Sequence, residues 1–246
     1  MKLIRITGAA AILLGIICVV RGDTTTTAGV KPLVTASLPA GIAATDVANP
    51  AHAAWEDIEA TPIHVNRTPP LYSDDKNDDG ERPTVTAKAG RLADGQVVVL
   101  IHWTDADANI APDPKAYADA GEEHVYQEHS ESVDEFADAA CAMVPRERAP
   151  HRSYPSIMMG DGTDPVDLYF WQAGVGFAVL KAAGMATVES TDTDPVGKAA
   201  RDADGWTCVM LIGDAPPQTP VCFGVWDGAK EHRDGLKFFS LWYEVQ

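Results

Sequence analysis

The strongest strand signal in this chain is the run Gln96-Val-Val-Val-Leu-Ile-His-Trp103. It is continuous, apolar and β-branched, which is typical of a strand in the interior of a sheet. Five further short runs resemble strands and are separated by Gly, Pro and Asp clusters. These runs are Thr84–Lys88, Val166–Trp171, Trp206–Ile212, Val221–Trp226 and Phe238–Tyr243. The pattern predicts a mainly β protein.

Helical patterns are few. Asp119–Tyr126 and Val133–Met143 are candidates, and the second is followed by Pro145. No Gly-x-Gly-x-x-Gly, no phosphate loop and no alternation of strands with helices occurs. We therefore expect an antiparallel β-sandwich with a few short helices, rather than a nucleotide-binding α/β fold.

The N-terminus resembles an export signal. Lys2 and Arg5 precede an uncharged, mostly apolar run from Ile6 to Val20. That run is short for a membrane span, and no cleavage site is obvious after it. Residues 1–22 are thus predicted to be a signal peptide or an N-terminal anchor, and the protein to be periplasmic or extracytoplasmic. Residues 23–50 are rich in Thr, Ala and Pro and are predicted to be a flexible linker, followed by one domain over residues 51–246.

The charge balance is strongly acidic, with 36 Asp and Glu against 19 Lys and Arg, a formal net charge of −17. Such a charge disfavours nucleic acid and anionic membranes as partners. An acidic surface of the kind adapted to high salt is the preferred interpretation, and an acidic docking face for a cationic partner is the alternative.

Cys141, Cys208 and Cys222 follow the N-terminal run. Their odd number gives no complete disulfide framework, and buried free thiols are expected. A bridge between Cys208 and Cys222 is the alternative. No Cys-x-x-Cys-His occurs, which excludes covalent attachment of a c-type haem.

Other common sites have little support. The histidines show no zinc spacing, and no Gly-x-Ser-x-Gly is present. Asp75 to Gly80 matches the first half of a calcium loop, but Thr86 stands where that loop needs a bidentate Glu. A solvated acidic turn is the preferred interpretation there.

Two features suggest a metal or cofactor. Met158 and Met159 precede Gly160-Asp161, and thioether sulfur suits haem iron or copper, although such a pair can also fill a core. Lys237 lies between Leu236 and Phe238. If Lys237 is buried, desolvation lowers its pKa and frees an amine that can ligate iron; otherwise it is a surface lysine at a strand end.

These two segments together resemble the haem b-binding γ subunits of molybdenum enzymes of the type II dimethyl sulfoxide reductase family. This family includes ethylbenzene dehydrogenase, dimethyl sulfide dehydrogenase, selenate reductase and chlorate reductase. The resemblance covers about residues 50–246 and rests on an ordered set of motifs. These are Trp55, His102–Asp105, Met158–Asp161, Pro165-Val166, Trp171, Trp206, Phe223–Gly228, Arg233–Lys237, Ser240 and Trp242.

The resemblance implies a β-sandwich that holds one non-covalent haem b between an axial methionine and an axial lysine. Carried to this chain, the ligands are Met159, with Met158 as the alternative, and Lys237. Lys230 is a poorer candidate for the lysine, since it sits in the loop. The resemblance also implies an electron-transfer subunit whose partners are a molybdopterin catalytic subunit, an iron–sulfur subunit and a soluble electron carrier. The chain departs from the family at Gly213-Asp214, where an arginine is expected.

A second hypothesis is a secreted β-sandwich binding module for carbohydrate or calcium-dependent adhesion. It accounts for the fold, the tether and the tryptophans. It does not account for the Met-Met-Gly-Asp motif together with Lys237.

Overall fold

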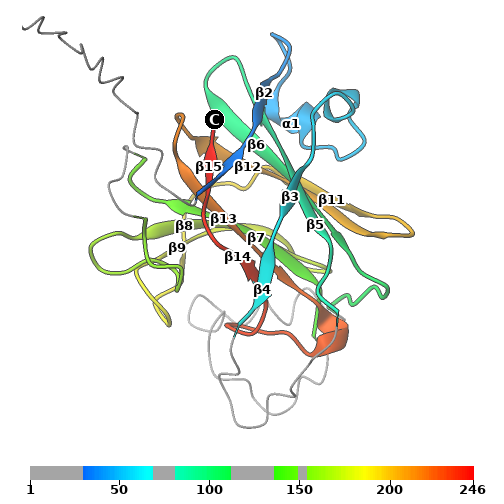
Figure 1. Cartoon of the computed structure of the whole chain (residues 1–246), viewed down its shortest axis with the longest axis vertical. Helices are drawn as coiled ribbons and strands as arrows, with labels where there is room; N and C mark the ends of the chain where they lie inside the picture. The colour runs from blue at the N-terminus through cyan, green and yellow to red at the C-terminus, as the bar shows by residue number, and fades with distance from the viewer. Residues whose placement is uncertain (1–29, 69–80, 112–135, 149–153) are drawn as a thin grey trace, which may run out of the picture.

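The computed structural model describes residues 30–68, 81–111, 136–148 and 154–246. Two β-sheets lie face to face in the described chain (Figure 1). Strand pairing is antiparallel except for β1 with β15 and β2 with β5. The predicted β-sandwich with few helices is confirmed.

The first sheet has nine strands. In spatial order its main path is β1 (Lys31–Leu33), β15 (Tyr243–Val245), β13 (Pro220–Trp226), β7 (Ala139–Pro145), β8 (Val166–Gln172), β9 (Gly176–Ala182) and β10 (Glu189–Ser190). Off this path, β14 (Phe238–Ser240) pairs with β13, and β4 (Val65–Arg67) pairs with β14.

The second sheet has six strands. Its order is β11 (Gly197–Arg201), β12 (Gly205–Asp214), β6 (Gln96–Thr104), β5 (Val85–Arg91) and β2 (Thr35–Ser37), and β3 (Thr61–Ile63) also pairs with β5. The helical elements of the described residues are α1 (Ala44–Val47) and two 3₁₀ turns, η1 (Ala53–Trp55) and η2 (Gly228–Lys230).

Strand β6 is buried on both of its faces, which explains its unbroken apolar run. Val97, Val99, Ile101 and Trp103 belong to the main core between the two sheets. Val98 and Leu100 belong to a second cluster, which includes Val47 of α1 and Trp55 of η1. A strand enclosed in this way has no solvent face and therefore no polar alternation.

A third apolar cluster lies on the face of the nine-stranded sheet that points away from the main core. Its buried members are Cys141, Met143, Val166, Leu168, Leu180, Ala182 and Cys222. Ile157 and Met159 from the loop before β8 pack against it. The candidate site lies at this third cluster.

The predicted helix over Val133–Met143 is wrong for its described part. Residues 139–145 form β7, which pairs with β13 on one side and with β8 on the other. All seven side chains of β7 are buried. Its sequence, AACAMVP, has helix-favouring alanines and no alternation, but two flanking strands impose the extended conformation. The other predicted helix, Asp119–Tyr126, lies outside the described residues.

The predicted linker over residues 23–50 is also wrong for its described part. From residue 30 onward the segment supplies β1, β2 and α1, and Leu33 and Val47 are fully buried. The strands are only three residues long, so composition outweighed pattern in the prediction. The domain therefore includes residues 30–50.

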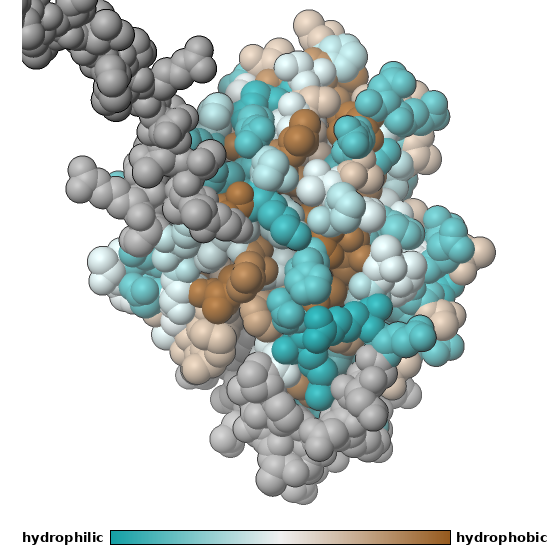
Figure 2. Space-filling model, viewed as in Figure 1, coloured by the Kyte–Doolittle hydropathy of each residue, from teal (hydrophilic) through white to brown (hydrophobic). Residues whose placement is uncertain are grey.

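All six strand predictions are confirmed, and the last one, Phe238–Tyr243, covers β14 and the start of β15. Cys141, Cys208 and Cys222 are buried free thiols, as expected. Cys208 and Cys222 lie in different sheets, on β12 and β13. Among the described residues, no helix is long and apolar enough to cross a membrane. The face in Figure 2 is largely hydrophilic or intermediate, with hydrophobic residues in smaller areas between polar ones.

Candidate cofactor site

A pocket opens on the outer face of the nine-stranded sheet, and its empty space, part of which is open to solvent, measures about 520 Å³. Its lining is mostly apolar and aromatic. The lining residues are Cys141, Met143, Ile157, Met159, Leu168, Phe170, Leu180, Cys222, Phe223, Gly224, Trp226, Asp234, Lys237 and Phe239.

The strand register builds the floor of the pocket from two cross-strand rows. One row runs Cys222, Met143, Leu168 and Leu180 across β13, β7, β8 and β9. The neighbouring row runs Gly224, Cys141, Phe170 and Ala178. Successive side chains of a strand point to opposite faces, so these rows share one face while the alternate residues face the main core.

Gly224 has a steric role in this floor. A Cβ placed at Gly224 would lie 3.3 Å from the Trp226 ring and 3.4 Å from Cδ of Lys237. The glycine therefore leaves room for the stem of the lysine. The sheet surface at this point is shaped around Lys237.

Met159 reaches the pocket from a strained turn. Its φ is +67°, which is rare for a residue with a side chain, and φ of Gly160 is +73°. The Gly160 amide donates to the Ser156 carbonyl at 2.8 Å, and the Gly184 amide donates to the Met159 carbonyl at 2.9 Å. Residues held in such backbone conformations are often found at functional sites.

The residues after Met159 fix this turn. A Cβ at Gly160 would lie 2.6 Å from the Asp164 carbonyl oxygen, so only glycine fits. Oδ1 of Asp161 accepts hydrogen bonds from the Thr163 amide at 2.8 Å and the Asp164 amide at 3.0 Å. These two hydrogen bonds lower the pKa of Asp161. Gly160 and Asp161 of the Met-Gly-Asp motif thus hold the backbone of the turn that carries Met159.

We predict that Gly160→Ala destabilises the fold by about 1–3 kcal/mol, because it forces a Cβ into a left-handed conformation against a carbonyl oxygen. For a domain of this size, Tm falls by roughly 2–4 °C per kcal/mol. Thermal unfolding followed by circular dichroism measures this change. Gly162→Ala is the matched control, because a Cβ there meets no atom within 4 Å. Equal Tm values for the two variants would contradict this account of the turn.

Lys237 is placed by a backbone contact with Thr68, the residue after β4. The Lys237 amide donates to Thr68 Oγ1 at 2.9 Å, and the Thr68 amide donates to the Lys237 carbonyl at 2.9 Å. Thr68 is buried, so these bonds are shielded from water. They fix the start of β14, and with it the direction in which Lys237 leaves the backbone.

The Lys237 amine has weak partners for a buried cation. Its Nζ lies 3.4 Å from the Asp234 carbonyl oxygen and 3.5 Å from that of Gly235, both long for hydrogen bonds. It also lies 5.1 Å from the centre of the Trp226 ring. Lys237 forms no salt bridge with any residue in the described ranges. Desolvation lowers the pKa of Lys237, which favours the neutral amine.

The two thiols of the floor are chemically quiet. Burial raises the pKa of Cys141 to about 12, and it raises the pKa of Cys222 well above its ordinary value. Both therefore stay protonated at neutral pH and act as small apolar groups. The other possible donors of the lining are the thioethers of Met143 and Met159, the side chain of Asp234 and the amine of Lys237. Among these, Met159 and Lys237 are the two ligands predicted from the sequence.

Of the three residues predicted as cofactor ligands, Met159 and Lys237 line the same pocket, whereas Met158 does not. Met158 is 41% exposed. Lys230, the poorer candidate for the lysine, lies at the end of η2 and forms a salt bridge with Asp227. The sequence did not identify the floor residues or Thr68. Alternation within Val166–Trp171 could have indicated Leu168 and Phe170, but no local signal marks Thr68.

Gly213-Asp214 stands where the family resemblance predicts an arginine, and in this structure Arg148 contacts the backbone on both sides of Gly213. Its guanidinium donates to the carbonyls of Ile212 at 2.8 Å and Asp214 at 2.6 Å, and also to the Tyr169 hydroxyl at 3.1 Å. Arg148 thus joins the ends of the two sheets and is not a lining residue of the pocket. Lys237 and Asp234 are the charged residues of the described lining.

The residues present fit a haem. A mostly apolar slot contains the thioethers of Met143 and Met159 and one amine, that of Lys237, whose pKa is lowered by burial. Thioether and nitrogen donors are both established axial ligands of haem iron. The lining is largely aromatic and aliphatic, which suits a non-covalent macrocycle.

No family model matches the chain. Three known proteins are similar to it. A chain described as a respiratory nitrate reductase heme subunit in Haloferax mediterranei is 28% identical over 211 residues, which are 79% of this chain and 66% of that protein. Chlorate reductase subunit gamma of Ideonella dechloratans is 24% identical over 83% of this chain and 82% of its own length. Dimethylsulfide dehydrogenase subunit gamma of Rhodovulum sulfidophilum is 32% identical over 35% of this chain and 40% of its own length.

The fold and the pocket define a β-sandwich with a cofactor slot on one outer face. The named relatives are γ or heme subunits of three different reductases and dehydrogenases. The predicted resemblance to the haem-binding γ subunits of the type II dimethyl sulfoxide reductase family is therefore confirmed. The alternative of a secreted carbohydrate-binding or adhesion module is not favoured.

Proposed function

We propose that this chain is the electron-transfer subunit of an exported molybdenum-containing oxidoreductase, and that it holds one non-covalent haem b. The observation that carries the proposal is the presence of Met159 and Lys237 in one apolar pocket. The similarity to proteins named as heme or γ subunits of reductases supports it independently.

Met159 and Lys237 would hold the haem from loops that flank the floor of the pocket. Met159 supplies a thioether that favours the reduced metal, and Lys237 supplies a harder amine that partly opposes this preference. When bound, haem b would supply one-electron redox chemistry, and Met159 and Lys237 would be the residues that hold it. Because the protein would supply both ligands, no position would be left for a substrate, and the function would be electron transfer.

The protein's own residues adapt the two donors to this task. The turn at Met159 and Gly160 sets the direction of the thioether before any cofactor binds. The hydrogen bonds between Thr68 and Lys237 do the same for the amine. The apolar floor excludes water and lowers the pKa of the lysine, so less free energy is lost to proton competition.

The proposed partners are a molybdopterin catalytic subunit, an iron–sulfur subunit and a soluble electron carrier. The support is that two of the similar proteins are named as γ subunits, which implies assemblies of several chains. The basic, then apolar, N-terminal segment supports a location outside the cytoplasmic membrane. Co-purification of the tagged chain from its native host, followed by metal analysis for molybdenum and iron, tests the assembly.

A haem-binding experiment tests the cofactor. The purified chain, loaded with haemin and reduced with dithionite, should show the sharp visible bands of a six-coordinate b-type haem. Denaturation in acidified butanone should then release the haem, because no covalent attachment is proposed. A protein that leaves the haemin spectrum unshifted, or that retains haem after denaturation, would overturn the cofactor assignment.

A further inference from the structure

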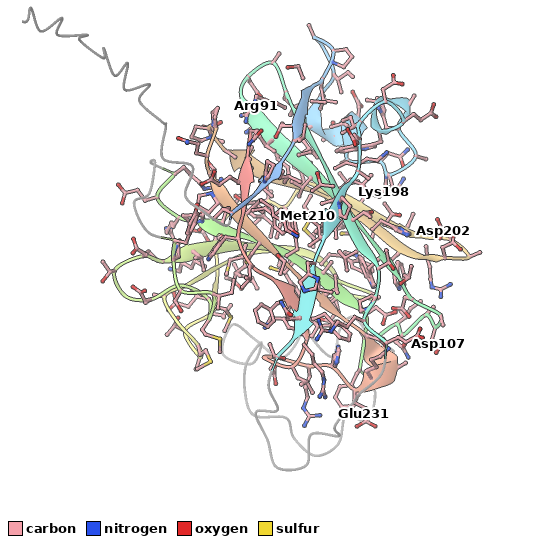
Figure 3. The ribbon with its side chains drawn as sticks, viewed as in Figure 1. Arg91, Asp107, Lys198, Asp202, Met210 and Glu231 are labelled. Carbon is pink, nitrogen blue, oxygen red and sulfur yellow. The ribbon has the colours of Figure 1, made fainter. Side chains whose placement is uncertain are left out.

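Three carboxylates from separate parts of the chain meet at one end of the sandwich. Asp105 follows β6, Asp138 precedes β7, and Asp227 follows β13. One carboxylate oxygen from each lies within 4.8 Å of the others. Asp107 and Glu231, which are close in sequence to Asp105 and Asp227, are labelled in Figure 3 and lie at the same end of the molecule. None of these three carboxylates lines the proposed haem pocket.

Asp138 is fixed at the centre of this cluster. Its Oδ1 accepts a hydrogen bond from the Gly228 amide at 2.9 Å. Its Oδ2 accepts from the Asn109 amide at 2.8 Å and from Trp206 Nε1 at 2.9 Å. Three donors from three segments thus orient one carboxylate, and Oδ1 retains a free lone pair.

A second observation indicates a missing ligand. Asp105 is only 7% exposed, and its Oδ1 accepts from the Asp107 amide at 3.1 Å. Its Oδ2 is buried and accepts no hydrogen bond within the described chain. Oδ1 of Asn109, whose amide contacts Asp138, is likewise buried and unpaired. Leaving such buried acceptors unsatisfied is unfavourable, and a bound cation would satisfy them.

The three carboxylates of the cluster outnumber the two basic side chains, Lys230 and Arg201, that contact its residues in the described structure. Lys230 pairs with Asp227, and Arg201 donates to the Asp105 carbonyl at 3.0 Å. Desolvation and then the carboxylates of Asp138 and Asp227 raise the pKa of Asp105 to about 7, although the Asp107 amide and Arg201 oppose this. Desolvation also raises the pKa of Asp138. Buried carboxylates in this condition take up either a proton or a metal cation.

We propose that Asp105, Asp138 and Asp227 form a Ca²⁺ site, with Oδ1 of Asn109 as a fourth protein ligand. All four donors are hard oxygens, which suit Ca²⁺, and water completes its usual six to eight ligands. Mg²⁺ requires a stricter octahedral arrangement, and zinc favours nitrogen and sulfur ligands. This site is distinct from the calcium-loop pattern at Asp75–Thr86, and it does not depend on the haem assignment.

The site would also act on the pocket through the chain. Asp227 and Gly228 begin the segment that ends at Lys237, and the Gly228 amide is bound to Asp138. A Cβ at Gly228 would overlap Asn109 and the Phe136 carbonyl, which shows how tightly this segment is packed. A cation there would therefore join three strand ends and anchor the loop that carries Lys237.

Calorimetric titration tests the proposal directly. The full chain, freed of metal with a chelator and kept at about pH 8, above the pKa of Asp105, is titrated with CaCl₂ and separately with MgCl₂. We expect one Ca²⁺ per chain, weaker Mg²⁺ binding and a higher Tm with Ca²⁺. Tb³⁺ provides a second signal, because Trp206 contacts Asp138 and should sensitise its luminescence.

Two variants and a control complete the test. Asp105→Asn should weaken Ca²⁺ binding by at least about tenfold, whereas Asn109→Asp, which adds a charge without changing shape, should tighten it. Asp192→Asn, an exposed acid, should change nothing. Absence of Ca²⁺ binding by the wild type at about 10 mM would overturn the proposal. A higher Tm for Asp105→Asn with no response to Ca²⁺ would show instead that the cluster holds only a proton.

Discussion

Lys237→Leu is expected to remove the six-coordinate spectrum of the haem-loaded protein. Leucine retains most of the apolar stem but has no donor atom, so the iron loses its nitrogen ligand. Changes in groups that merely orient a ligand already weaken metal binding by about 10–100-fold, so loss of the ligand itself should weaken haem binding by at least about tenfold. Visible spectroscopy and haem titration measure the two effects.

Lys198→Leu is the matched control for this prediction. Lys198 is an exposed lysine on β11 of the other sheet, labelled in Figure 3. Its replacement should leave both the spectrum and the haem affinity unchanged. If Lys237→Leu also keeps the six-coordinate spectrum, Lys237 is not the nitrogen ligand.

The wild-type spectrum should also depend on pH in one direction. Only the neutral amine binds iron, so acid opposes ligation by protonating Lys237. Because desolvation lowers the pKa of Lys237, the proton competes less than it would at an exposed lysine. We expect conversion to a five-coordinate spectrum as the pH falls, and this transition should be absent in Lys237→Leu. A spectrum of Lys237→Leu that titrates as the wild type does would assign the transition to another group.

The strands that could be predicted from the sequence are those whose burial produces a recognisable pattern in their own residues. Strand β6 was predictable because burial on both faces leaves an unbroken β-branched run. Strand β7 was not, because its alanines are extended only through pairing with β13 and β8. Strands β1 and β2 are too short to show a period, and their pairing partners are distant in the chain.

The candidate site was predictable to a similar degree. Met159 and Lys237 stand out by residue type and by resemblance, and the structure brings both into one pocket. Thr68, which positions Lys237 from 169 residues away, leaves no local signal. Asp105 and Asp227 lie in two motifs of the resemblance, but no sequence pattern indicates that they meet Asp138, because only the sheet register brings the three carboxylates together.

Met159→Leu is expected to lower the reduction potential of the bound haem and to make the iron five-coordinate. The thioether favours the ferrous state, and leucine fills the same volume without a donor. Axial ligands vary haem potentials over a range of about 0.8 V, so a shift on the order of 0.1 V is expected from the loss of one ligand. Leucine at position 159 bears the same backbone strain as methionine, since φ is +67° for either side chain. Potentiometric titration followed in the visible bands gives the shift without interference from a change in the turn.

Met158→Leu is the internal control, and the contrast between the two variants decides between the sulfurs of Met158 and Met159. Met158 is 41% exposed and lies outside the pocket lining, whereas Met159 is part of it. Replacement of Met158 should therefore leave both the potential and the spectrum unchanged. If Met158→Leu shifts the potential and Met159→Leu does not, the turn must rearrange when haem binds. In that case the left-handed conformation of Met159 would belong to the free protein, and the strain at that residue would be the source of the rearrangement.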